Sequence, residues 1–145
     1  WVRQGAAAER ITLHYDVTYA CVEGPRLGTR AESFFLQHAG CHVVGMTNVP
    51  EVFLAREAQM AYASIGIVTD YDCWRDDPGH DASVAAILER YAASLATVRR
   101  LLDALLATDA PEAEPEIRAA LRDAMLTRDD ALTPEQREWL DVLRR

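Results

Sequence analysis

A run of eight residues without a charged group, residues 61–68, leads directly to two aspartates placed two positions apart, Asp70 and Asp72. Such a run is typical of a strand covered on both faces, as in a parallel sheet. Ligands of open α/β sheets bind beyond the carboxyl ends of these strands, where a carboxyl taken out of water can hold a proton for delivery. An aspartate-rich turn that merely ends the strand explains the same pattern, so both interpretations stand at this point.

Two further strand candidates precede this run. Residues 11–22 are rich in Thr, Tyr and Val, and residues 42–46 form a shorter candidate. Between them, Thr29 is followed three residues later by Glu32, which is a capping-box pattern. The pattern predicts a short helix that ends before Gly40.

A second predicted helix, residues 48–60, begins with Asn48 as its N-cap residue and Pro50 in its first turn. The element order is therefore strand, helix, strand, helix, strand, and crossovers of this length predict parallel strands with right-handed connections. The loops that follow the three strands should gather at one edge of the sheet. These loops are residues 23–29, 46–48 and 69–72.

A long amphipathic helix is predicted over residues 83–107, followed by a helical tail. Its apolar residues recur every three or four positions, as in a helix packed on a core; they are Val84, Ile87, Leu88, Tyr91, Leu95, Val98, Leu102 and Leu105. In the tail, Thr133 and Gln136 repeat the capping-box pattern. We expect one α/β domain over residues 1–110 and a tail over residues 111–145 that packs on the same domain or on a neighbouring subunit.

Composition excludes several classes of partner. The formal net charge of -8 argues against nucleic acid or an anionic membrane surface as the main partner. Three cysteines, Cys21, Cys41 and Cys73, form no closely spaced pair, which favours a reducing, cytoplasmic compartment. No apolar run is long enough to span a bilayer. Trp1 has no feature of a natural N-terminus, so we expect a fragment or a processed piece.

The two aspartates fit two different chemistries. Asp70 and Asp72 can act as a pair of acids on an organic substrate, or as an Asp-x-Asp pair that holds a divalent cation, and their spacing does not separate these roles. A zinc site is disfavoured because the chain has no Cys-x-x-Cys or His-x-x-x-His pattern. The potential zinc ligands are His38, Cys41, His42, Cys73 and His80.

Other catalytic motifs are missing. No strand-turn-helix nucleophile elbow surrounds Ser33, Ser64 or Cys73, and the chain has no Gly-x-Gly-x-x-Gly motif. Covalent catalysis and dinucleotide binding are therefore disfavoured. Thr47 offers a hydroxyl and a backbone amide at a predicted helix N-terminus, where a phosphate or a sugar oxygen can be held, although a role in the cap explains it equally well.

Four segments together resemble the second half of a known enzyme family. They are Glu23-Gly24-Pro25-Arg26, Arg30-Ala31-Glu32-Ser33, Gly45-Met46-Thr47-Asn48-Val49-Pro50-Glu51 and Thr69-Asp70-Tyr71-Asp72-Cys73-Trp74. In this order and spacing they are similar to 5'-methylthioadenosine phosphorylases, of the trimeric purine nucleoside phosphorylase family. The resemblance is strong over residues 18–74. It implies the C-terminal half of an α/β fold, with a mixed sheet flanked by helices, a long helix and a helical tail.

The resemblance also implies a pentosyltransferase reaction in purine and methionine salvage. Phosphate would displace adenine from C1' of 5'-methylthioadenosine and form 5-methylthioribose 1-phosphate. Asp70 would hold a proton against N7 of the base, and Asp72 would help to read the 6-amino group. Because a carboxyl can both donate and accept, an acid here favours 6-amino over 6-oxo purines.

The remaining site residues are implied by the same family. Met46 would lie against the ribose, and Thr47 would contact phosphate. An apolar pocket for the 5'-methylthio group would exclude a charged substituent through its desolvation cost, and it would be formed by Val84, Ile87 and Leu88.

Leu27 and Gly28 depart from the family, which has an aromatic residue and then serine at these positions. Leucine can still cover a purine face, although without aromatic stacking. Glycine leaves space there that water can fill. We keep both residues as base-binding candidates.

Members of the family are about twice as long as this chain, and their first half supplies the phosphate loop and the Arg and His that neutralise phosphate. Without these groups the nucleophile lacks most of its electrostatic stabilisation. We therefore expect activity only with a companion chain that carries the N-terminal half, in a homotrimer of the complete unit. No cofactor or metal is implied, and inorganic phosphate is the co-substrate. The alternatives are a 6-oxopurine or other nucleoside phosphorylase, a non-catalytic fragment, and an Asp-x-Asp metal-dependent enzyme.

Overall fold

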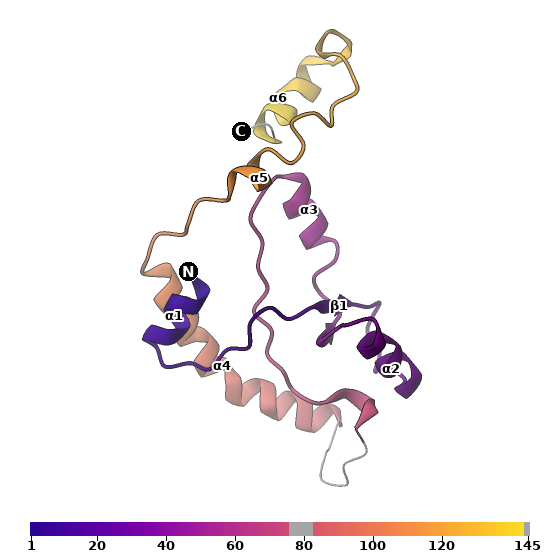
Figure 1. Ribbon diagram of the computed structural model, residues 1–145, viewed down its shortest axis with the longest axis vertical. Helices are drawn as coiled ribbons and strands as arrows, with labels where there is room; N and C mark the ends of the chain where they lie inside the picture. Colours follow the sequence, from indigo (N-terminus) through magenta and orange to yellow (C-terminus); the bar gives the residue numbers. More distant parts are fainter. Residues whose placement is uncertain (76–82, 144–145) are drawn as a thin grey trace. The chain divides into compact units, whose positions relative to one another are not determined.

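The computed structural model describes residues 1–75 and 83–143. Its elements are named in Figure 1, and they are α1 (Val2–Ala8), β1 (Tyr19–Cys21), α2 (Arg30–His38), β2 (Val43–Gly45), α3 (Glu51–Glu57), η1 (Asp72–Trp74), α4 (Val84–Leu106), α5 (Pro115–Arg118), η2 (Asp129–Ala131) and α6 (Pro134–Leu143). The chain divides into two compact units. The first unit comprises Trp1–Met46 with Ile65–Pro111, and the second comprises Thr47–Ser64 with Glu112–Arg145. The boundary at residue 110 stays a prediction.

The core of the first unit lies between α1 and the C-terminal part of α4 (Figure 1). Ala6 is 0% exposed and Leu101 is 1% exposed. The helices approach closely at Gly5, where a Cβ atom would lie 2.8 Å from Cδ2 of Leu105. The sequence analysis missed α1, because its seven residues carry no capping signal and too few apolar positions to show a period.

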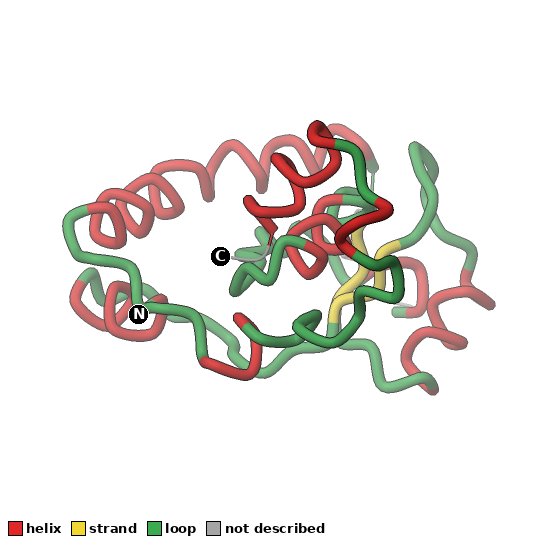
Figure 2. Tube along the Cα trace, turned by 90° about the horizontal axis from the view of Figure 1, so that it is seen from above, coloured by secondary structure: helices red, strands yellow, loops and turns green. Residues whose placement is uncertain are grey.

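A two-stranded sheet forms the second feature of this unit, and Figure 2 shows β1 and β2 as adjacent strands. The predicted parallel pairing is confirmed, with Tyr19 opposite Val43 and Cys21 opposite Gly45. A Cβ atom on Gly45 would overlap the Tyr19 hydroxyl, so glycine at this strand position lets the Tyr19 side chain lie across it. The predicted first strand, residues 11–22, is too long, because Asp16 adopts a left-handed φ of 59° that interrupts it.

The predicted third strand, residues 61–68, is wrong: these residues form no strand in the structure. An extended apolar run becomes a strand only where it finds a partner for its backbone N–H and C=O groups. Ile65 packs instead against the apolar core between α1 and α4. Among the described residues the sheet therefore has two strands, β1 and β2, in place of the three that were predicted.

The predicted cap at Thr29 is confirmed, and a further side-chain cap that was not predicted forms at Ser83. The Thr29 hydroxyl accepts a hydrogen bond from the Glu32 N–H (3.2 Å) at the start of α2, and the Ser83 hydroxyl accepts one from the Ala86 N–H (3.3 Å) at the start of α4. The predicted apolar face of α4 is only partly covered. Leu101 is buried, whereas the predicted core position Leu102 is 44% exposed, because consecutive residues of a helix point in different directions and only the side that carries Leu101 and Leu105 packs in the core.

The second unit joins α3 to the helical tail. Asn48 is not the side-chain cap of α3; its amide donates to the Ser64 hydroxyl (2.7 Å), and Pro50 occupies the N-cap position. Gln59 accepts a hydrogen bond from the Leu121 N–H (3.0 Å) and donates to the Leu143 carbonyl (2.7 Å), so one side chain ties the end of α3 to the tail.

The predicted capping box of α6 is confirmed. The Gln136 N–H donates to the Thr133 hydroxyl (3.2 Å), and the Thr133 N–H donates to the Gln136 side chain (2.9 Å). Over the part of the chain that is described, no helix combines the length and apolar character needed to cross a bilayer.

Candidate functional site

The loops that follow β1 and β2 meet, as parallel pairing predicts. Gly24, in the loop after β1, lies so close to Met46 that a Cβ atom there would stand 2.5 Å from the Met46 sulfur and 3.1 Å from its Cγ. The absence of a side chain at Gly24 therefore lets Met46 lie against this loop. Gly24 was named only as part of a family segment and not as a site residue, since a Gly-Pro pair is equally typical of an ordinary turn.

Asp70 is fixed by two hydrogen bonds within its own turn. Its Oδ2 accepts from the Thr69 hydroxyl (2.9 Å), and its Oδ1 accepts from the backbone N–H of Asp72 (2.7 Å). The second bond is an Asx turn, in which a carboxylate accepts from the amide two residues ahead. Arg90 on α4 also donates to the Thr69 carbonyl (2.9 Å), so the long helix holds the backbone just before Asp70.

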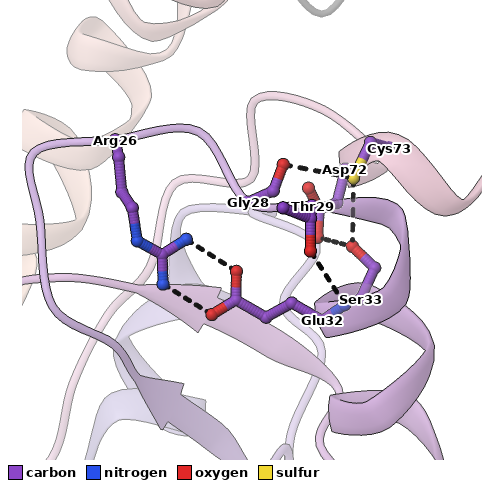
Figure 3. A network of polar contacts seen from close by, with 7 residues as sticks. All are labelled: Arg26, Gly28, Thr29, Glu32, Ser33, Asp72 and Cys73. Atoms are coloured by element: carbon purple, nitrogen blue, oxygen red, sulfur yellow. Dashed lines mark hydrogen bonds and ion pairs between the residues drawn. The ribbon is translucent and has the colours of Figure 1, made fainter.

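Asp72 lies beside Gly28 and α2. Its φ of 57° falls in the left-handed region, which aspartate tolerates better than most residues. Oδ2 accepts a hydrogen bond from the Ser33 hydroxyl (Figure 3). The point where Gly28 would carry a Cβ atom lies 3.2 Å from Oε2 of Glu32, 3.6 Å from Oδ1 of Asp72 and 3.9 Å from Oδ2, so glycine lets this loop pack closely against both carboxylates.

Ser33 and Cys73 complete a group of residues that we call the Asp72 network; its members are Gly28, Ser33, Asp72 and Cys73, which Figure 3 shows, and Asp70, which accepts from the Asp72 N–H. The Ser33 hydroxyl lies 3.5 Å from the Cys73 sulfur, which in turn donates to the Gly28 carbonyl (3.5 Å). Ser33 is 3% exposed, and it is the only buried polar residue among the described positions. From the sequence, Ser33 was considered as a nucleophile and as part of a family segment but not as a partner of Asp72, because a serine in the first turn of a helix gives no local sign of a distant carboxylate.

Arg26 and Glu32 form a bidentate ion pair at the rim of this network (Figure 3). Two N–H groups of Arg26 donate to the two carboxylate oxygens of Glu32, at 2.7 and 2.6 Å. These hydrogen bonds hold the pKa of Glu32 below its ordinary value, against the opposing effect of desolvation, and they raise the pKa of Arg26. The Thr29 hydroxyl thus caps the Glu32 N–H at the start of α2, while the Glu32 side chain binds Arg26.

The remaining predicted site residues make no contact described above with Asp70 or Asp72. Leu27 is 64% exposed next to Gly28. Val84 and Leu88 lie exposed on the first turns of α4, and Ile87 is half-buried there. Thr47 belongs to the second unit and not to the unit that holds Asp70 and Asp72.

The potential metal ligands do not gather. Within residues 1–75 and 83–143, no group of three or more His, Cys, Asp or Glu side chains is placed to hold a metal ion. Cys21, Cys41 and Cys73 are free thiols. His80 lies outside the described residues.

Comparison with known proteins identifies the family. Residues 2–107 match the phosphorylase superfamily. An S-methyl-5'-thioadenosine phosphorylase from Bradyrhizobium diazoefficiens is 42% identical over 142 residues, which cover 95% of this chain and 48% of the relative. A protein of the same name from Thermofilum pendens is 42% identical over 116 residues, which cover 80% of this chain and 43% of the relative.

Solved structures share the fold. A methylthioadenosine phosphorylase from an Antarctic soil metagenomic library superimposes with a TM-score of 0.74 at 33% identity, over 98% of this chain and 50% of that chain. The methylthioadenosine phosphorylase of Schistosoma mansoni in complex with adenine gives a TM-score of 0.66 at 32% identity, over 90% of this chain and 51% of that chain.

The chain spans about half the length of the curated relatives it matches. The predicted fold class, the C-terminal half of a nucleoside-phosphorylase fold, is confirmed by these relatives. Because the family match extends over residues 2–107, this chain belongs to the phosphorylase superfamily.

Proposed function

We propose that this chain forms the purine-binding side of a phosphorylase that converts 5'-methylthioadenosine and phosphate into adenine and 5-methylthioribose 1-phosphate. The observation that carries the proposal is the placement of Asp70 and Asp72 in one turn, where Ser33 holds Oδ2 of Asp72 and Oδ1 accepts no hydrogen bond from a described residue. The names and sequence identity of the relatives support this substrate.

In the proposed reaction, a phosphate oxygen forms a bond to C1' of the sugar while the bond from C1' to N9 of the base breaks. The electron pair of that bond moves into the purine, which becomes basic at N7. Asp70 delivers a proton to N7 and so neutralises the leaving group. Its hydrogen bonds to Thr69 and to the Asp72 N–H fix the direction of the carboxyl, which is what general acid catalysis requires.

Asp72 and its neighbours select the base. A carboxylate oxygen accepts a hydrogen bond from a 6-amino group and opposes a 6-oxo group, where two acceptors would face each other. Gly28 and Leu27 contact the base from the loop after β1, where the exposed Leu27 side chain covers the purine face.

The sugar and phosphate contacts are proposed on family resemblance. Met46, held against the loop at Gly24, contacts the ribose, and Thr47 contacts phosphate. An apolar pocket takes the 5'-methylthio group, and the exposure of Val84 and Leu88 leaves both side chains available for it; its residues are Val84, Ile87 and Leu88.

The phosphate-binding half is proposed to come from a companion chain, in a cytoplasmic homotrimer that needs no cofactor. The sheet has only two strands among the described residues, and such a sheet is marginally stable by itself. Three free thiols agree with a reducing compartment. Mass spectrometry of the purified protein under denaturing conditions tests the companion; a single species of 16.2 kDa would contradict it.

Substitution of Asp70 tests the proposed chemistry. In a phosphate-dependent assay of the complete enzyme with 5'-methylthioadenosine, Asp70→Ala should lower kcat by about two orders of magnitude or more, the scale of a lost general acid. Asp123→Ala, at an exposed position of the second unit, is the matched control and should retain normal turnover. Near-normal phosphorolysis by Asp70→Ala would overturn the assignment.

The same assay compares substrates and conditions. Faster turnover of inosine than of 5'-methylthioadenosine would contradict selection of a 6-amino purine. Activity that survives in a chelator would exclude the Asp-x-Asp metal enzyme, and phosphate-dependent turnover would exclude a non-catalytic fragment.

A further inference from the structure

The Ser33 hydroxyl is buried, and both of its side-chain partners belong to the Asp72 network. The residue is 3% exposed, and the partners of its oxygen are Oδ2 of Asp72 and the sulfur of Cys73. A buried hydroxyl is costly unless it is hydrogen-bonded, so this side chain and the Asp72 carboxylate depend on each other. The Ser33 backbone takes part in the hydrogen bonding of α2, since its N–H donates to the Thr29 carbonyl (3.0 Å).

The hydrogen bond from Ser33 distinguishes the two oxygens of Asp72. Oδ2 accepts from Ser33, whereas Oδ1 accepts no hydrogen bond from any described residue. A carboxylate held by one oxygen presents the other in a fixed direction. The oxygen that can accept from a ligand is therefore selected by a residue on a different element, α2.

The same hydrogen bond supports the second acid. The N–H of Asp72 donates to Oδ1 of Asp70, and the Asp72 backbone is left-handed at a φ of 57°. A non-glycine residue in this conformation needs its surroundings to hold it. Ser33 supplies such a contact from α2, so it helps to keep both acids in their relative positions.

We propose that Ser33 is a positioning residue that directs Oδ1 of Asp72 toward the 6-substituent of a bound purine and thereby sets the preference for 6-amino over 6-oxo bases. This role rests on the proposed function. Without the Ser33 hydroxyl the Asp72 carboxylate can rotate. The difference in affinity between a purine with a donor at position 6 and one with an acceptor there then becomes smaller.

Binding of adenine and hypoxanthine to the purified protein tests the role, by titration calorimetry on the chain together with any companion that co-purifies. In Ser33→Ala the ratio of the two Kd values should fall by about tenfold, the loss expected for one hydrogen bond to a charged group. Ser33→Cys keeps the size of the side chain and a weak donor, and its ratio should lie between those of the wild type and Ser33→Ala. Circular dichroism confirms that each variant is folded.

Ser94→Ala is the matched control, because the Ser94 hydroxyl donates to the Arg90 carbonyl within α4 (3.0 Å) and not to the Asp72 network. Its Kd ratio should equal that of the wild type. A Ser33→Ala protein that binds both bases more weakly but at the wild-type ratio would show a merely structural role and overturn the proposal. If the wild type itself does not prefer adenine, the proposed function fails, and the role of Ser33 fails with it.

Discussion

The contact between α1 and α4 and the Asp72 network are held together by opposite means. The first is apolar and tight, with Ala6 and Leu101 almost fully buried and Gly5 admitting Leu105 to close range. The second is polar and half-exposed, and it depends on a left-handed aspartate and a single buried hydroxyl. Apolar packing supplies free energy of folding, whereas directed hydrogen bonds supply geometry. Substitutions in the two regions should therefore separate stability from ligand selection.

The largest effect on stability is expected for Leu101→Ala. Removing this fully buried side chain leaves a cavity in the contact between α1 and α4, which should lower the free energy of unfolding by about 2–5 kcal/mol. Leu102→Ala is the matched control, because Leu102 lies next to it on α4 but is 44% exposed, and its cost should be well below that of Leu101→Ala. Urea unfolding followed by circular dichroism measures both. Equal costs would show that the core lies elsewhere.

Gly5→Ala should have a smaller effect of the same kind. The new Cβ atom would lie 2.8 Å from Cδ2 of Leu105, and Leu105 is buried and cannot move freely. Overpacking of this size costs about 1–3 kcal/mol, from which the better helix propensity of alanine recovers about 1 kcal/mol. Gly66→Ala is the control, since its Cβ atom would have no neighbour within 4 Å. A urea midpoint for Gly5→Ala above that of the wild type would contradict the close approach of the two helices.

Local chemistry explains which parts of the fold could be predicted from the sequence. The caps at Thr29 and Thr133 depend on residues three positions apart, and both form as predicted. The strand predicted over residues 61–68 depended on a partner that only tertiary structure can supply, and it does not form. At Asn48 the same capping chemistry failed, because its amide binds Ser64 instead.

The candidate site also contains some residues that could be predicted from the sequence and one that could not. Asp70, Asp72 and Gly28 were singled out from sequence, and the structure brings Asp72 close to both of the others. Ser33 was missed as a partner of Asp72 because 39 residues separate them, and only the packing of η1 on α2 brings them together. Sequence therefore indicated the charged groups, whereas the neutral group that orients one of them required the structure.

The smallest effect is expected at the rim of the network, where Glu32→Gln replaces the carboxylate that binds Arg26. Arg26 holds the pKa of Glu32 below its ordinary value in the folded chain. A carboxyl with a lowered folded pKa stabilises the fold above its unfolded pKa, and this contribution is lost as the pH falls through the folded pKa. The wild type should therefore be slightly more stable than Glu32→Gln at neutral pH, and the difference should shrink below about pH 4. Thermal unfolding of both proteins across this pH range measures it.

Arg26→Met removes the same ion pair from its other side, and it distinguishes the pair from the rest of the network. Because the pKa of Arg26 is raised, its guanidinium loses its charge only in strongly alkaline solution. Within this ion pair, the change of stability at acidic pH therefore comes from Glu32. In the Arg26→Met background, Glu32→Gln should change Tm little at any acidic or neutral pH, since the carboxylate no longer has its partner. A Tm difference between the wild type and Glu32→Gln that widens on acidification would mean that the carboxylate destabilises the fold. The start of α2, and with it Ser33, would then be held by the Thr29 cap and the Asp72 contact without help from this ion pair.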